Sequence, residues 1–104
     1  MQVIHEVYFT LADRSPAARD TLVQECLKWL PGHDGMIRFN AGTRIEEHTR
    51  DVNVLDWDVA INALFDTKAA HDAYQNTSER HKKFVERNKA GWAKVRVFDS
   101  YLKG

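Results

Sequence analysis

The chain has 104 residues, of which 43% are apolar, and its fifteen basic residues balance its fifteen acidic ones. This length and composition are typical of one globular domain, so we expect residues 1–104 to form a single domain. The charges are scattered and form no basic stripe of the kind that binds phosphates, which argues against nucleic acid as a partner.

Cys26 is the only cysteine, which excludes an intramolecular disulfide and a thiolate metal cluster. No apolar run reaches the ~18 residues of a membrane span, and the N-terminus enters an alternating pattern without the layout of a signal peptide. We therefore expect a cytoplasmic protein with no membrane partner and no cofactor.

The first part of the chain predicts a strand and then a helix. Period-two alternation predicts a strand over residues 3–11, and His5 lies on its strongly apolar face. Ser15 followed by Pro16 is a good helix start. An apolar stripe at helical spacing continues from there to the Pro-Gly pair at 31–32, which ends the helix.

Two further strands are predicted in the middle of the chain. Alternation returns over residues 37–41, and Gly42 ends or bulges this strand. Residues 43–55 are mostly polar or charged and form a connection that is longer than usual for a hairpin. Residues 56–65 predict the third strand, which is apolar on both faces from Val59 onward and therefore indicates cover on both sides.

A helical region with a break follows the third strand. Thr67 and Ser78 are suited to cap two successive helices. Helical spacing places Tyr74 on the inner stripe of the first helix and His81 on the apolar face of the second, whereas His71 is expected to face solvent.

A last strand is predicted over residues 94–102. The complete order is strand, helix, strand, strand, helix pair, strand, which is the ferredoxin-like arrangement with helices on one face of a four-stranded antiparallel sheet. The other face of the sheet needs cover, and a second copy of the sheet is the economical solution. We therefore predict an α+β fold and a dimeric α+β barrel.

Several short motifs in this order resemble the stress-responsive dimeric α/β-barrel (Dabb) family. They are HEVYF near the start, Gly42 after the second strand, DWDVAINALFD in the third strand, AYQ…H..FV in the helical segment and VRVFDS near the end. The resemblance extends from Val3 to Leu102 and implies a homodimer whose two sheets pack face to face. Most members have no assigned activity; relatives include a polyketide cyclase that catalyses an aldol condensation and cofactor-free monooxygenases.

The resemblance also implies site residues. In the cyclase, a tyrosine and a histidine of the second helical region act on the substrate, and Tyr74 and His81 are the nearest matches here. His5 matches a pocket histidine of the first strand. The chain departs from the family pattern in YQNTSERH, which lacks a His-Pro pair, and in Val59, which stands where the cyclase has a histidine.

Our candidate catalytic residues are His81, Tyr74 and His5. Histidine titrates near neutral pH, so His81 is suited to act as a general base, while the Tyr74 hydroxyl would bind a carbonyl or phenolate oxygen. The alternative is a structural role for all three. His5 would be a core histidine with a hydrogen-bond partner, and Tyr74 would pack its ring and leave its hydroxyl at the rim.

Phe39, Trp92 and Asp58 are our candidate ligand-binding residues. The two aromatic side chains would form the walls of an apolar pocket. Asp58 either orients a histidine or pairs with an arginine, and we favour the structural pairing. A metal site from His5, His81 and Asp58 has no support from any metal-binding spacing, so we expect none.

The sequence therefore predicts a homodimer, formed through sheet faces, that binds a small hydrophobic or aromatic molecule. The pocket is expected within each protomer, between the sheet and the helices. Two alternatives remain open: a cyclase-like lyase that uses a histidine base, and a stress-responsive assembly module without catalysis. The sequence does not decide whether the protein is an enzyme.

Overall fold

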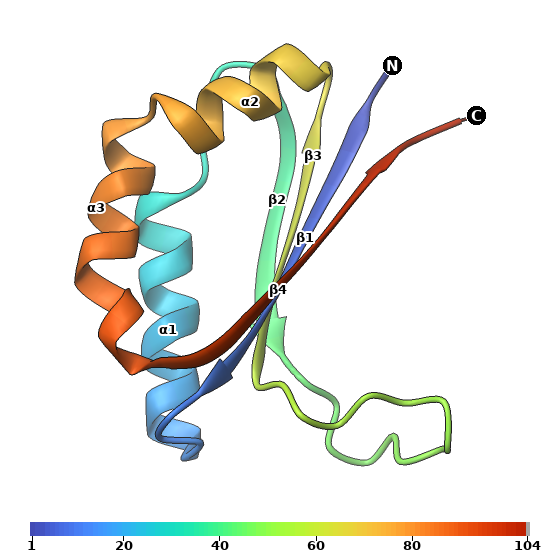
Figure 1. Cartoon of the computed structure of the whole chain (residues 1–104), viewed down its shortest axis with the longest axis vertical. Helices are drawn as coiled ribbons and strands as arrows, with labels where there is room; N and C mark the ends of the chain where they lie inside the picture. The colour runs from blue at the N-terminus through green and yellow to red at the C-terminus, as the bar shows by residue number, and fades with distance from the viewer. Residues whose placement is uncertain (104) are drawn as a thin grey trace.

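The chain folds into one antiparallel sheet whose helices all lie on the same face (Figure 1). The computed structural model describes residues 1–103. Its elements are β1 (Val3–Leu11), α1 (Pro16–Trp29), β2 (Met36–Thr43), β3 (Val59–Phe65), α2 (Lys68–Asn76), α3 (Glu79–Asn88), a short 3-10 turn (Lys89–Gly91) and β4 (Trp92–Tyr101). This order confirms the predicted ferredoxin-like α+β fold.

Strand β1 lies inside the sheet, whose order is β2-β3-β1-β4. It pairs antiparallel with β3 on one side and with β4 on the other. Its odd-numbered side chains are all buried, and its even-numbered ones are half-buried. The predicted alternation is therefore confirmed, and His5 lies in the helix-facing core at 4% exposure.

Helix α1 begins where the sequence predicted. The Ser15 hydroxyl accepts a hydrogen bond from the Ala18 N–H at 3.2 Å, and Pro16 occupies the first helical turn. The helix buries Leu22 and Cys26 as it packs against β2 and β3. No helix within residues 1–103 is long and apolar enough to cross a membrane.

The third and fourth strands differ from their predicted bounds. Strand β3 begins at Val59 and not at residue 56, because Asp58 and the residues before it leave the strand ladder. The preceding connection, residues 44–58, extends from the sheet on the side opposite the helices (Figure 1). Strand β4 begins at Trp92, two residues earlier than predicted, because Trp92 still pairs with Leu11 across a register shift in β1.

Gly35 sets the position of α2 relative to the sheet. It has a φ of +78°, which side-chain-bearing residues rarely adopt. A Cβ at this position would also clash with the side chains of Ala70 and Asp66. The Gly35 carbonyl accepts a hydrogen bond from the Asp66 N–H at 2.8 Å, so the chain entering β2 packs directly against the start of α2.

Asp58 is a buried anchor at the start of β3. Its side chain accepts hydrogen bonds from the Leu11 N–H at 2.9 Å and from Arg14 Nε at 3.0 Å, and the residue is only 2% exposed. The Asp58 N–H in turn donates to the Phe9 carbonyl at 2.8 Å. This arrangement is the arginine pairing that the sequence favoured for Asp58.

We expect Asp58→Ala to lower the free energy of unfolding by about 2–3 kcal/mol, because it leaves the buried Leu11 N–H without an acceptor. Urea denaturation followed by circular dichroism measures this change. Asp56→Ala is the matched control: Asp56 is an exposed carboxylate that bonds to Lys94 and Arg96, so its loss should barely move the midpoint. Equal effects of the two substitutions would contradict the anchoring role.

Candidate functional site

The candidate site is built on a row of side chains that crosses the helix-facing side of the sheet. His5 of β1 pairs with Ala63 of β3 and with Asp99 of β4, and Ala63 pairs in turn with Phe39 of β2. Residues opposite one another in a sheet point to the same face. His5 Nδ1 lies 2.6 Å from Asp99 Oδ1, so the buried imidazole is hydrogen-bonded to a half-exposed carboxylate of the edge strand.

Helix α2 adds a histidine and a tyrosine above this row. Thr67 caps the helix by accepting a hydrogen bond from the Ala70 N–H. His71 and Tyr74, three residues apart on one face, are 4% and 2% exposed. The ring centroid of His5 lies 4.4 Å from that of His71 and 5.9 Å from that of Tyr74.

Tyr74 is also in contact with two further histidines. The His81 ring, from the first turn of α3, has its centroid 4.9 Å from that of Tyr74. The His33 ring, from the connection between α1 and β2, is at the same centroid distance. Ser78 joins the two segments, because its hydroxyl caps α3 at the His81 N–H and lies 2.6 Å from His33 Nε2. We call His5, His33, His71 and His81 the histidine cluster.

Burial favours the uncharged forms of the ionisable groups around Tyr74. It lowers the pKa of His71 and His81, and the neighbouring His5 lowers both further. Burial likewise lowers the pKa of His33 and raises that of Tyr74. At neutral pH the site therefore offers imidazole nitrogens that accept protons and a phenol that donates a hydrogen bond.

The structure brings together the three residues predicted to be catalytic, His5, Tyr74 and His81. Phe39 lies in the same cross-sheet row as His5 and packs against the core. Trp92 packs instead on Phe9 and Phe84, with its ring centroid 4.9 Å from that of Phe9.

Asp58 lies at the other end of the sheet from His5. It adjoins Leu11, six residues along β1 from His5, which corresponds to ~20 Å of strand. It is therefore outside the histidine cluster.

One expectation about the site was wrong. His71 was expected to face solvent but is buried, because the inner face of α2 follows the His71–Tyr74 spacing of three residues. The sequence was sufficient to predict this burial, because Tyr74 was assigned to the inner face and His71 lies three residues before it on the same face of the helix. Asp99 was missed for a different reason: only the strand register places it beside His5.

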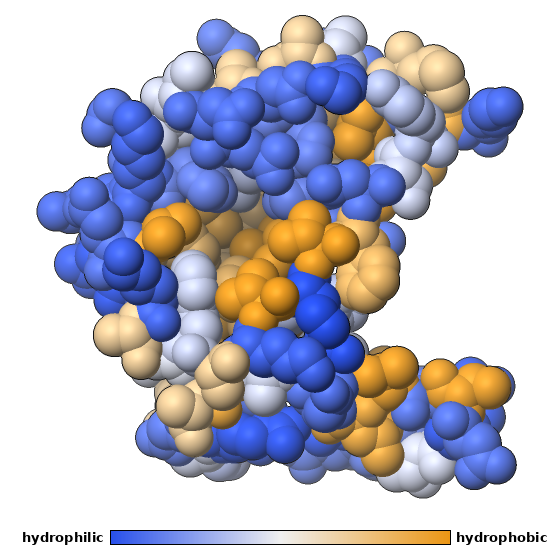
Figure 2. Space-filling model, in the orientation of Figure 1, coloured by the Kyte–Doolittle hydropathy of each residue, from blue (hydrophilic) through white to orange (hydrophobic). Residues whose placement is uncertain are grey.

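Strand β4 leaves apolar side chains uncovered on the helix-facing side of the sheet. Val95 and Val97 pair with the buried Phe9 and Val7 and so share their face, yet they are 41% and 49% exposed. Figure 2 shows hydrophobic side chains around a hollow between α3 and β4. We call this hollow the α3–β4 recess. His81 is half-buried and belongs to the first turn of α3.

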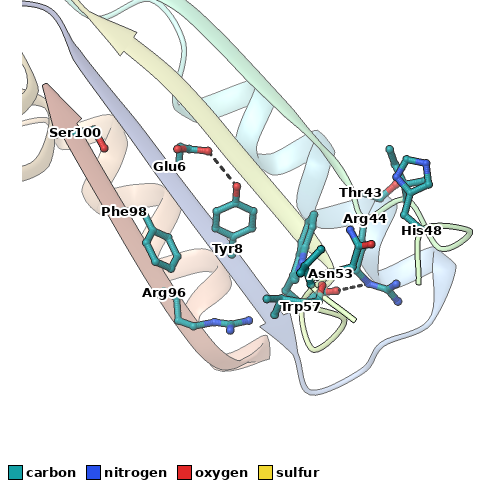
Figure 3. A pocket seen from close by; sticks show the side chains of 13 residues that line it. Glu6, Tyr8, Thr43, Arg44, His48, Asn53, Trp57, Arg96, Phe98 and Ser100 are labelled. Atoms are coloured by element: carbon teal, nitrogen blue, oxygen red, sulfur yellow. Dashed lines mark hydrogen bonds between the residues drawn. The ribbon is translucent and has the colours of Figure 1, made fainter. Parts of the chain in front are cut away.

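The opposite face of the sheet carries a second concavity, which the sequence did not predict. It has a volume of about 770 Å³ and lies between the even-numbered side chains of β1 and β4 and the 44–58 connection (Figure 3). Tyr8 donates a hydrogen bond to Glu6 at 3.0 Å and stacks edge-on against Trp57, with the centroids 4.9 Å apart. Phe98 borders the same concavity and is 54% exposed.

Comparison with known proteins assigns the chain to a family. Residues 3–102 match the Stress responsive A/B Barrel Domain (Dabb) family, so the chain belongs to it and the predicted resemblance is confirmed. None of the curated proteins compared with the chain matches it.

Solved structures share the fold at low sequence identity. A Dabb family protein of Mesorhizobium loti is 21% identical, with a TM-score of 0.79, over 99% of this chain and 98% of its own. A dimeric ferredoxin-like protein of unknown function from Thermobifida fusca is 16% identical, with a TM-score of 0.79, over 98% and 92%. The hydroxynitrile lyase of Passiflora edulis is 14% identical, with a TM-score of 0.75, over 98% and 94%.

The lowered pKa values of His33, His71 and His81 predict a loss of stability in acid. When the unfolded histidines take up protons as the pH falls below about 6.5, the folded ones stay neutral, so protonation favours the unfolded chain. The free energy of unfolding should be highest above this pH. It should decrease as the pH falls towards the lower pKa values that these histidines have in the folded chain. Urea midpoints at pH 7.5 and 5.5 measure the loss.

His71→Gln should reduce this loss, because glutamine does not titrate. The control is His48→Gln, because His48 lies exposed in the 44–58 connection, and this variant should lose as much stability in acid as the wild type does. If the pH dependence of the His71 variant equals that of the wild type, burial of His71 does not set its titration.

Proposed function

We propose that the protein binds a small hydrophobic or aromatic molecule in the α3–β4 recess, beside the histidine cluster. The observation that carries this proposal is the exposure of Val95 and Val97 on the helix-facing side of the sheet, the side that also carries His5 of the histidine cluster. Apolar walls with a few polar groups at one end are the usual composition of a small-molecule site.

The polar groups define which ligands suit the site. Burial raises the pKa of Tyr74 and lowers that of His81, so at neutral pH the phenol can donate a hydrogen bond and the imidazole can accept one. A ligand with a carbonyl or phenolic oxygen on an apolar body would use both groups, and burying that body against Val95 and Val97 would supply most of the affinity.

We further propose that a second copy of the chain covers the face of the sheet opposite the helices, which we call the open face. Support comes from the apolar side chains exposed on that face and on the 44–58 connection, among them Phe98, Ile45 and Val54 at 54–55% exposure. An exposed patch of this kind usually marks an interaction surface. The Thermobifida fusca protein of the same fold is described as dimeric.

Neighbouring residues of β4 allow the two surfaces to be tested separately. Val97 borders the recess and Phe98 the open face, because side chains alternate along a strand. Val97→Glu should weaken binding of the neutral dye Nile red by about tenfold, the value of roughly one buried apolar side chain, without changing the mass of the assembly. Fluorescence titration and native mass spectrometry provide the two readouts.

Phe98→Glu is the matched substitution and should have the opposite pattern, with a monomer mass and unchanged affinity for the dye. If the Phe98 variant loses dye binding and the Val97 variant keeps it, the ligand site is the concavity of the open face and the recess proposal is wrong. If the wild type is already a monomer, the dimer proposal is wrong.

A second candidate function is removal of a proton next to a carbonyl group by His81. It is favoured by the lowered pKa of His81, which keeps the imidazole in its basic form, and by the adjacent phenol of Tyr74. One relative of the same fold is a lyase. The carbonyl oxygen would accept the Tyr74 hydrogen bond while the proton moves to the imidazole.

This candidate predicts that the protein accelerates exchange of the methyl protons of acetophenone with deuterated water. His81→Ala should reduce the acceleration by about 10²–10⁴-fold, the usual contribution of a general base. Proton NMR measures the exchange, and circular dichroism checks the fold of the variant. His48→Ala is the control and should keep the wild-type rate. If the wild-type protein exchanges the protons no faster than buffer without protein, this candidate is wrong and only the binding function remains.

A further inference from the structure

His71 Nε2 is a buried polar atom without a partner. Within residues 1–103, four buried side-chain nitrogens lack a hydrogen-bond partner: Trp29 Nε1, His71 Nε2, Trp92 Nε1 and Arg96 Nε. Indole and guanidinium groups carry only donors, so His71 is the one of the four that offers a lone pair to a metal ion. Buried polar groups normally have a partner, so the imidazole nitrogen calls for one.

Two further donor atoms face this nitrogen. Ligand atoms of His5, His71 and Asp99 all lie within 4.8 Å of one another. Asp99 Oδ1 is 2.6 Å from His5 Nδ1 and 3.9 Å from His71 Nε2. Three elements supply these groups, β1, α2 and β4, which is why no spacing in the sequence indicated them.

We propose that His5, His71 and Asp99 form a binding site for a divalent first-row transition metal such as Zn²⁺. Nitrogen and carboxylate ligands bind Zn²⁺ at about 2.0–2.2 Å, so neighbouring donors around it lie roughly 3.0–3.5 Å apart. The His5–Asp99 distance must lengthen and the His71–Asp99 distance must shorten, each by less than about 1 Å. The His5 and His71 nitrogens lie within 4.8 Å of one another and must approach by up to about 1.8 Å. Asp99 is on the edge strand and its side chain is 42% exposed, which leaves the carboxylate room for this movement.

The surroundings suit a site with an open coordination position. His71 and Asp99 border a surface cavity of about 180 Å³, so a water molecule or a small anion can reach the metal from outside. Lys68 and Asp72, which form an ion pair at 2.6 Å, line the same cavity. Two histidines and one carboxylate with open positions are a ligand set used by catalytic Zn²⁺ and non-haem Fe²⁺ centres.

This site goes beyond the proposed function and is an alternative to the expectation that the chain binds no metal. His5 and His71 both belong to the histidine cluster, but neither of them nor Asp99 is needed for a ligand that contacts Val97 and His81. The two proposals can therefore fail independently.

The test titrates Co²⁺, and separately Zn²⁺, into untagged full-length protein that has been freed of metal with a chelator. We expect one metal ion per chain by isothermal titration calorimetry. The visible spectrum of bound Co²⁺ should lack the sulfur charge-transfer band, because the only thiol, Cys26, is not among the ligands. Asp99→Asn, which changes a half-exposed group and keeps its shape, should weaken binding at least tenfold.

His71→Leu should weaken binding at least as much as Asp99→Asn. His48→Ala and His81→Ala are the matched controls and should bind the metal as the wild type does. If the His71 variant does not fold, imidazole nitrogen NMR of the wild type decides: the His71 signal should move with added Zn²⁺, and the His48 signal should not. Absence of stoichiometric binding, or unchanged affinity in Asp99→Asn, would overturn the proposal.

Val97→Glu and Asp99→Asn separate this site from the recess. The first should weaken Nile red binding and leave metal affinity unchanged, and the second should do the reverse. If either variant loses both Nile red binding and metal binding, the recess and the metal site are one site, and the proposal of two separate sites is wrong.

Discussion

The position of β1 inside the sheet determines most of what this protein can do. A strand that is paired on both sides and covered by helices must bury every second side chain. One of those side chains is His5, and a buried imidazole needs a polar partner. Asp99 meets that need from the neighbouring strand, so the register between β1 and β4 also fixes the polar end of the candidate site.

Helices α2 and α3 add further polar side chains to the core around His5. His71, Tyr74 and His81 converge from α2 and α3 where aliphatic side chains would pack with less desolvation. Gly35 permits this approach, because any side chain there would push α2 away from the entry to β2. Buried titratable groups that gather beside a recess are more common at functional sites than in ordinary cores.

Local patterns in the sequence were sufficient for the fold. Alternation in β1, the Ser15-Pro16 helix start and the caps at Thr67 and Ser78 each depend on residues close together in the chain, and each was confirmed. The family resemblance then singled out His5, Tyr74 and His81 as candidate site residues, and the structure shows that they lie together.

Features that depend on distant residues could not be obtained in this way. Asp99 lies beside His5 only because of strand register, 94 residues along the chain. The concavity on the open face requires the path of residues 44–58, whose polar sequence sets no regular structure. His71 is an intermediate case: helical spacing from Tyr74 would have placed it inside.

The alternation along β4 has a consequence for how this family member can change. Val97 and Phe98 are adjacent in the chain but belong to different surfaces, so single substitutions alter one surface at a time. An insertion or deletion of one residue in β4 would turn each following side chain to the other face. Such a change before residue 98 would turn the Asp99 side chain away from His5. It would also turn Phe98 from the open face to the helix-facing side. We therefore expect β4 to tolerate replacement of its residues far better than any change in its length.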